Sequence, residues 1–222
     1  MHIEPGYIVQ AKVMAADAVA LGVLAYYAKD LIKRPVDLVK TLLAAVFFSL
    51  FMQSFHMSIG PSELHFIGAT AMYLTLGFLP TLLGFAVGLL LQGLLFEPGD
   101  LPHLAVNSLS LIVPLVVMHK TLGHKLFDPN TGWRVSWANI LKLDAIYYSG
   151  VILMVGFWLS ISQVETPLVA WAAWASSYLA VVAVEPLVSY TIVRAMKHFE
   201  ANAVIGQWFE VRRLTLAYSQ AG

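Results

Sequence analysis

Apolar residues gather along this chain in seven long segments, separated by short polar stretches. The segments lie at about 8–28, 40–57, 64–79, 80–96, 104–119, 143–162 and 167–194. The hydrocarbon core of a bilayer is about 30 Å thick and needs about 20 helical residues to cross it. Each segment comes near that length, so the pattern predicts an all-α integral membrane protein with about seven transmembrane helices.

The third and fourth segments are short and meet at Phe78-Leu79-Pro80. Proline has no backbone N–H and restricts the residue before it, which disfavours one continuous helix through this point. We therefore expect a tight break between two helices here.

Composition supports the membrane class. Of the 222 residues, 59% are apolar and 12% are charged, whereas soluble domains have about 25% charged residues. The absence of cysteine excludes disulfides and thiolate metal sites, and the zero net charge argues against a nucleic-acid partner. We expect one polytopic domain over residues 1–222, with a helix bundle at 8–194 and a cytoplasmic tail at 195–222.

The basic residues predict the orientation, because short cytoplasmic loops retain Lys and Arg. Twelve of the thirteen follow the first, fifth and seventh segments, which seven crossings place on one side. Only Lys12 falls on the other side, where the loops carry Glu63, Glu97, Asp100 and Glu165. The N-terminus is thus expected outside and the C-terminus in the cytoplasm.

The chain opens Met1-His2, and we expect no export leader in front of it. The α-amine of Met1, the deprotonated amide of His2 and one imidazole nitrogen of His2 can close two chelate rings around one ion. Such a planar nitrogen set suits Ni(II) or Cu(II) and accepts Co(II), whereas zinc prefers a tetrahedron. Residues 1–7 are therefore a candidate metal-chelating segment; alternatively, His2 is incidental, since termini tolerate change.

A fourth nitrogen would come from a histidine on the outer side. His119, His124 and His198 lie at the cytoplasmic face in the expected topology, which leaves three candidates. His65 opens the third segment, His56 closes the second and competes with it, and His103 precedes the polar Asn107 in the fifth. Asn107 would either orient a ligand imidazole or form an interhelical hydrogen bond.

These features together resemble a known family. Met1-His2, the pattern Ser62-x-x-His65, the run LLLQGLLF and then Asn107 are similar to the CbiM/NikM family. Its members are the cobalt- or nickel-binding S components of energy-coupling-factor (ECF) transporters. The resemblance implies Ni²⁺ or Co²⁺ as transported substrate, held by the Met1 amine, the His2 amide and imidazole, and His65, with Asn107 near the site. It also implies a transmembrane coupling subunit and ATPase subunits as partners.

The chain departs from the family pattern near both parts of this site. Glu4-Pro5 replace the usual Pro-Asp, and Gly60-Pro61-Ser62-Glu63 stand where the family has Gly-Gly-Thr-Ser. Whether His56 or Glu63 joins the metal shell is therefore open.

Two acidic residues, Asp17 and Glu185, fall inside predicted spans, where carboxylates are functional candidates; Asp17 would hold an ion or support packing. Small residues four apart on the first span (Ala11/Ala15, Ala16/Ala20, Ala18/Gly22) and on the fourth (Gly84/Gly88) allow close helix contact. By the resemblance, the first set touches the coupling subunit; intramolecular packing is the alternative.

The expected function is metal capture by the membrane component of an ATP-driven ECF transporter in the cell (inner) membrane. No GxxxxGK[ST] loop is present, so ATP hydrolysis falls to partner chains and we expect no enzyme activity. The alternatives are a stand-alone metal permease, a membrane haem or redox protein with paired histidine ligands, and a structural subunit.

Overall fold

The computed structural model describes Ile3 and residues 6–59 and 62–217. Eight α-helices, one two-stranded antiparallel sheet and short 3₁₀ turns make up this part of the chain. The helices are α1 (Gln10–Ala28), α2 (Pro35–Ser54), α3 (Ala69–Leu76), α4 (Phe78–Leu95), α5 (Leu104–Thr121), α6 (Trp137–Ser160), α7 (Leu168–His198) and α8 (Ala203–Trp208). The strands are β1 (His56–Ile59) and β2 (Ser62–His65), and a 3₁₀ turn, η2 (Pro98–His103), leads into α5.

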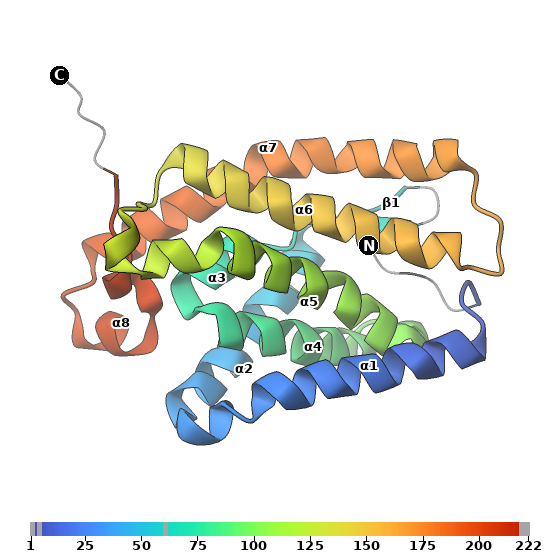
Figure 1. Cartoon of the computed structure of the whole chain (residues 1–222), viewed down its shortest axis with the longest axis horizontal. Helices are drawn as coiled ribbons and strands as arrows, with labels where there is room; N and C mark the ends of the chain where they lie inside the picture. Colours follow the sequence, from blue (N-terminus) through green and yellow to red (C-terminus); the bar gives the residue numbers. More distant parts are fainter. Residues whose placement is uncertain (1–2, 4–5, 60–61, 218–222) are drawn as a thin grey trace.

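In the described part of the chain, six helices are long and apolar enough to cross a membrane: α1, α2, α4, α5 with η2, α6 and α7. They run roughly side by side along the long axis of the molecule (Figure 1). Their outer faces carry large apolar side chains, such as Leu21, Leu153 and Leu179, which are more than 60% exposed. Exposed leucines at these positions are suited to lipid contact, and the all-α membrane fold is confirmed.

The third predicted span is wrong as a continuous helix. Residues 64–79 contain the end of β2, the eight-residue α3 and the start of α4. His56, expected at the end of the second span, instead begins β1, because α2 stops at Ser54. The hairpin and α3 together still carry the chain from one end of the bundle toward the other (Figure 1). Six long helices and one composite segment therefore make the seven passes that the hydropathy pattern indicates.

The break between the third and fourth segments is confirmed, but its pivot is Gly77 rather than Pro80. Gly77 has a φ of 95°, a backbone conformation that residues with a Cβ rarely adopt. Pro80 lies in the first turn of α4, where the missing N–H would have had no helical partner.

Helices α2 and α4 pack most closely against each other. A Cβ added at Gly84 would lie 2.5 Å from the Cβ of Ala44, and one at Gly88 would lie 2.5 Å from Cδ1 of Phe48. The Gly84/Gly88 pair therefore serves packing within the bundle. On α1, by contrast, Ala11, Ala15, Ala18 and Gly22 are exposed, while Ala16 and Ala20 face the core.

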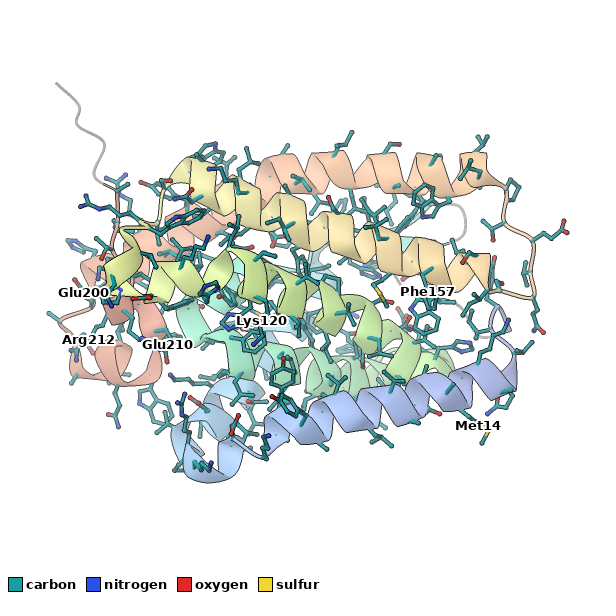
Figure 2. All side chains as sticks on the ribbon, in the orientation of Figure 1. Met14, Lys120, Phe157, Glu200, Glu210 and Arg212 are labelled. Atoms are coloured by element: carbon teal, nitrogen blue, oxygen red, sulfur yellow. The ribbon has the colours of Figure 1, made fainter. Side chains whose placement is uncertain are left out.

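The C-terminal residues fold back onto the bundle. Glu210 accepts a hydrogen bond of 2.7 Å from Nζ of Lys40 on α2, and its side chain also lies beside Gly77. Glu200, Glu210 and Arg212 cluster at the end of the molecule that holds α8, whereas Met14 projects outward from α1 (Figure 2). Residues 199–217 thus cover one end of the helices.

Candidate metal centre

The beginning of the chain is fastened into the bundle. Ile3 is fully buried, and its backbone N–H donates a hydrogen bond of 2.9 Å to Oδ1 of Asn107 on α5. The carbonyl of Tyr7 accepts bonds from the N–H of Gln163, at 2.9 Å, and from the hydroxyl of Ser162, at 2.8 Å. These contacts hold Ile3 against α5 and Tyr7 against the loop that joins α6 to α7.

Asn107 therefore has a defined structural role. Asn107 is 1% exposed, and its side-chain oxygen accepts the hydrogen bond from the backbone N–H of Ile3. The sequence predicted that Asn107 is polar and buried. The partner that it suggested was either a ligand imidazole or a group on another helix. A partner 104 positions away in the chain left no signal in local spacing.

The metal-ligand prediction at Met1 and His2, and the neighbouring Glu4 and Pro5, lie outside the described residues. Ile3, the next residue after His2, is the first point at which the chain is described.

The β-hairpin presents two histidines opposite each other. His56 of β1 and His65 of β2 are paired across the strands, and their ring centroids lie 6.2 Å apart. They differ in environment, because His65 is 3% exposed whereas His56 is among the exposed residues. Of the two, His65 is the one that lies within the protein interior.

Glu63 holds the ring of His65. Its Oε2 lies 2.9 Å from Nε2 of His65, since residues two apart on a strand share a face. The backbone carbonyl of Glu63 in turn accepts a hydrogen bond of 3.3 Å from Nε1 of Trp174 on α7. The hairpin is thus attached to α7, and the Glu63 carboxylate leaves Nδ1 as the nitrogen of His65 that this contact does not engage.

His103 ends η2 at the start of α5 and is buried. Neither of its ring nitrogens has a hydrogen-bond partner among the described residues. Over residues 3, 6–59 and 62–217, no three His, Asp or Glu side chains converge as a metal-binding group. His56, Glu63, His65 and His103 do not make up a metal shell on their own.

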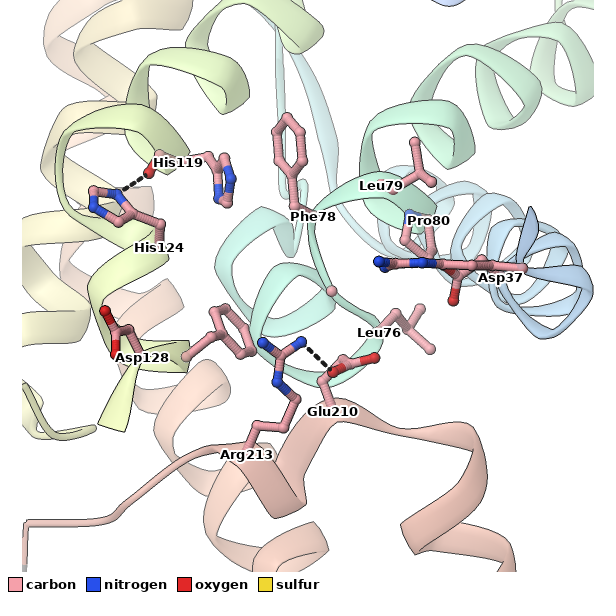
Figure 3. Close-up of a pocket in the computed structure, with 13 residues that line it drawn as sticks. Asp37, Leu76, Phe78, Leu79, Pro80, His119, His124, Asp128, Glu210 and Arg213 are labelled. Carbon is pink, nitrogen blue, oxygen red and sulfur yellow. Dashed lines mark hydrogen bonds and ion pairs between the residues drawn. The ribbon is translucent and has the colours of Figure 1, made fainter. Parts of the chain in front are cut away.

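A separate pocket of about 430 Å³, lined by both charged and apolar residues, lies at the opposite end, near α8. His119 stacks on Phe78 there, with ring centroids 3.9 Å apart, and its Nδ1 lies 2.8 Å from the Tyr73 hydroxyl. Glu210 is bound by Arg213 at 3.2 Å (Figure 3). His119 and His124 both line this pocket, so they are remote from the hairpin as the topology predicted.

One buried acidic residue was missed in the sequence. Asp144 is fully buried on α6, next to the equally buried Glu185 of α7. The apolar segment was predicted to begin at 143, which placed Asp144 at its edge, but α6 begins at Trp137. Asp17, by contrast, is exposed on α1.

Comparison with known proteins identifies the family. The CbiM family, described as "Cobalt uptake substrate-specific transmembrane region", matches residues 2–203. No curated protein matches the chain.

Two solved structures share the fold. A transition metal transporter is 21% identical with a TM-score of 0.72, covering 94% of this chain and 97% of its own. A truncated transition metal transporter is 20% identical with a TM-score of 0.70, covering 90% and 99%. The match over nearly the whole bundle confirms the resemblance drawn from the sequence: the chain belongs to the CbiM family and is a multi-pass membrane component of transition-metal uptake.

Proposed function

We propose that this chain is the substrate-binding S component of an ATP-driven ECF transporter that takes up Ni²⁺ or Co²⁺. The metal is held by the Met1 amine, the amide and imidazole of His2, and the imidazole of His65. A planar set of four nitrogens suits both ions. The two solved structures that share the fold are described as transition metal transporters, which agrees with the ion class.

The observation that carries this proposal is the anchoring of Ile3. Ile3 is buried and hydrogen-bonded to Asn107 inside the bundle, and His2 is joined to it by one peptide bond. Consecutive Cα atoms are about 3.8 Å apart, so a bond that fixes Ile3 also limits where His2 can go. A chelating terminus needs such an anchor to meet a histidine from another element.

His65 supplies the fourth nitrogen through Nδ1, with Glu63 as its supporting partner. Metal-binding histidines usually donate their other N–H to a carboxylate or carbonyl, which fixes the tautomer and makes the ligating nitrogen more basic. The 2.9 Å contact between Glu63 Oε2 and His65 Nε2 has this arrangement. Glu63 thus supports the ligand, and the exposed His56 and the separate His103 stay outside the shell.

Proton release should accompany binding. The two imidazoles must be neutral and the His2 amide must lose its proton, so metal affinity falls as the solution becomes acidic.

Partner chains supply the energy. No phosphate-binding loop occurs in the sequence, and ATP hydrolysis requires one in transporters of this class. The outward-facing Ala11, Ala15, Ala18 and Gly22 of α1 give a transmembrane coupling subunit a surface for close helix packing. A stand-alone permease is the rival, and it predicts metal uptake by cells that lack the ATPase subunits.

The site is tested by titrating purified protein with Ni(II) and Co(II) and comparing His65→Ala with His56→Ala. The two histidines face each other across the hairpin, so the second variant is a matched control. We expect His65→Ala to weaken binding at least a hundredfold and His56→Ala to leave it within about threefold. Equal effects of the two substitutions would contradict the ligand assignment.

A further inference from the structure

One face of α7 runs along the backbone of the segment that carries His65. Trp174, Tyr178 and Glu185 are separated by four and by seven residues, so they lie on one side of the helix, and all three are 0% exposed. Strand β2 and helix α3, which precede and follow each other around His65, both pack against α7. The three side chains are therefore placed to act on the chain at and after His65.

Two of these side chains act on strand β2. Nε1 of Trp174 donates a hydrogen bond of 3.3 Å to the backbone carbonyl of Glu63, and the Tyr178 hydroxyl faces the backbone N–H of His65. The rings of Trp174 and Tyr178 also pack edge to face, with centroids 5.1 Å apart, an arrangement that favours fixed side chains. The backbone that carries the His65 imidazole is thus approached from α7 at two successive points.

Glu185 acts on the start of α3, which begins four residues after His65. The first N–H groups of a helix have no partner within the helix, and the residue before α3 is Gly68, which has no side chain to cap them. The backbone N–H groups of Gly68, Ala69 and Thr70 face the Glu185 carboxylate. Glu185 therefore takes the place of a capping side chain, at a helix end where negative charge is favourable.

Glu185 is itself held by α6. The Tyr148 hydroxyl donates a hydrogen bond to Oε2 of Glu185, and the Tyr148 ring packs against the ring of Tyr178 with centroids 5.4 Å apart. Tyr148 thus contacts both of the α7 side chains that follow Trp174. These contacts connect α6 and α7 to the backbone on both sides of His65.

A histidine ligand on this hairpin depends on such contacts. A two-stranded hairpin is at best marginally stable by itself, so the elements that pack against it set the position of its backbone. A metal site needs its ligands held within about 0.5 Å of the productive geometry. The Glu63 carboxylate orients the ring of His65, but it belongs to the same strand and cannot hold the strand in place.

We propose that Tyr178 and Glu185 are positioning residues of the metal site, which hold the backbone on both sides of His65 and keep its imidazole in place for the N-terminal chelate. This inference rests on the proposed function. Neither residue is a ligand, since each acts on the main chain of another element. Their loss should loosen the hairpin and lower metal affinity while every proposed ligand stays present.

The first measurement is hydrogen–deuterium exchange of residues 62–70 in the purified, metal-free full chain. Tyr178→Phe removes the hydroxyl and keeps the ring, and Glu185→Gln keeps an acceptor of similar shape but removes the charge. We expect exchange in 62–70 to become faster by about fivefold or more in both variants. Tyr147→Phe removes an equally buried hydroxyl on α6 and is the matched control, which should exchange at the native rate.

The second measurement is titration with Ni(II), followed by the absorption spectrum of the saturated protein. Loss of a group that supports a histidine ligand costs about 10–100-fold in affinity. We expect a loss of about tenfold or more in Tyr178→Phe and in Glu185→Ala, with part of it recovered in Glu185→Gln. The spectrum of bound Ni(II) should change as well, because it depends on the geometry of the ligands.

A stability control separates positioning from general destabilisation. Gly88→Ala introduces a clash where α4 meets α2, away from α7. It should lower the thermal midpoint but keep the native Ni(II) affinity, the native spectrum and the native exchange rate in 62–70.

Native exchange rates in 62–70 for both Tyr178→Phe and Glu185→Gln overturn the inference, and so does faster exchange that leaves Ni(II) affinity and spectrum unchanged. Failure of the proposed function gives a different result. Ni(II) binding by the native chain is then absent, or equally tight in His65→Ala, whatever the exchange rates are, and the positioning role falls with it.

Discussion

The backbone N–H of Ile3 is hydrogen-bonded to Oδ1 of Asn107 at 2.9 Å, within a fully buried environment. This single contact joins Ile3 to the first turn of α5, across 104 positions of sequence. It holds Ile3 in the interior, next in the chain to the proposed chelating residues Met1 and His2.

Asn107→Ala should therefore weaken metal binding without removing any proposed ligand. The substitution leaves the buried N–H of Ile3 without its acceptor, which costs about 1–3 kcal/mol in the closed arrangement. We expect Ni(II) affinity to fall about tenfold or more in calorimetric titration. Ser108→Ala changes a neighbouring buried residue and serves as the control. Unchanged affinity in Asn107→Ala would mean that the anchor does not contribute to binding.

Glu63→Ala should weaken metal binding less than His65→Ala does. Loss of a carboxylate that supports a histidine ligand costs about 10–100-fold in affinity, whereas loss of the ligand itself costs more. Glu63→Gln keeps an acceptor for Nε2 of His65 and should lie between native and alanine. Glu165→Gln, in the exposed α6–α7 loop, is the charge control. A loss equal to that of His65→Ala would place Glu63 among the ligands.

Gly88→Ala should destabilise the bundle through the contact of α4 with α2. The added Cβ would meet Cδ1 of Phe48 at 2.5 Å and the carbonyl oxygen of Ala45 at 3.1 Å. Overpacking of this kind costs about 1–3 kcal/mol and should lower the thermal midpoint in detergent. Gly22→Ala on α1 has nothing within 4 Å and should be neutral or stabilise by up to about 1 kcal/mol. Equal midpoints for the two variants would show that α2 and α4 do not pack as described.

Glu210→Gln should destabilise the protein at neutral pH and lose its effect in acid. Burial raises the pKa of the Glu210 carboxyl, but hydrogen bonds and charges from Lys40 and Arg213 outweigh this and hold the pKa below its ordinary value of 4.5. A carboxylate with a lowered pKa stabilises the fold above its ordinary pKa, and that contribution is lost as the pH falls through the folded-state value.

The measurement is the difference in thermal midpoint between the native protein and Glu210→Gln at pH 7 and at decreasing pH. We expect the free energy of unfolding to fall by about 1–3 kcal/mol at pH 7, because Lys40 is 5% exposed and its remaining ion-pair partner among the described residues is Asp37, at 3.7 Å. The difference should shrink steadily below pH 4.5. A difference that does not depend on pH would rule out the ionic contribution.

Most of the fold followed from hydropathy, because a helix that crosses lipid must be both long and apolar. Hydropathy did not predict the structure of the third segment. Ala69–Leu76 is entirely buried within the protein, so its apolar residues reflect contact with other helices rather than contact with lipid. Gly68 and Gly77, both with positive φ, flank the helix at its two ends. Composition alone showed a continuous apolar run there.

The sequence singled out candidate site residues by their type, but it did not reveal their contacts. His65 and Asn107 stand out because polar residues are rare in apolar segments. The hydrogen-bond partners of the candidate site residues do not stand out in the sequence. Trp174 reaches the backbone carbonyl of Glu63, and Asn107 reaches the backbone of Ile3; backbone groups are present at every position, so no pattern marks them. Asp144 was missed because the start of α6 is amphipathic and its apolar run begins later than the helix.

The most direct test of the central claim is Ni(II) and Co(II) binding by the native chain and by a version with one alanine inserted between Met1 and His2. The insertion keeps every side chain and the Ile3–Asn107 bond, but moves the α-amine out of the compact chelate. The account predicts that tight binding collapses by at least a hundredfold. Equal binding by the two proteins would contradict it and leave His65 to bind metal without the terminus.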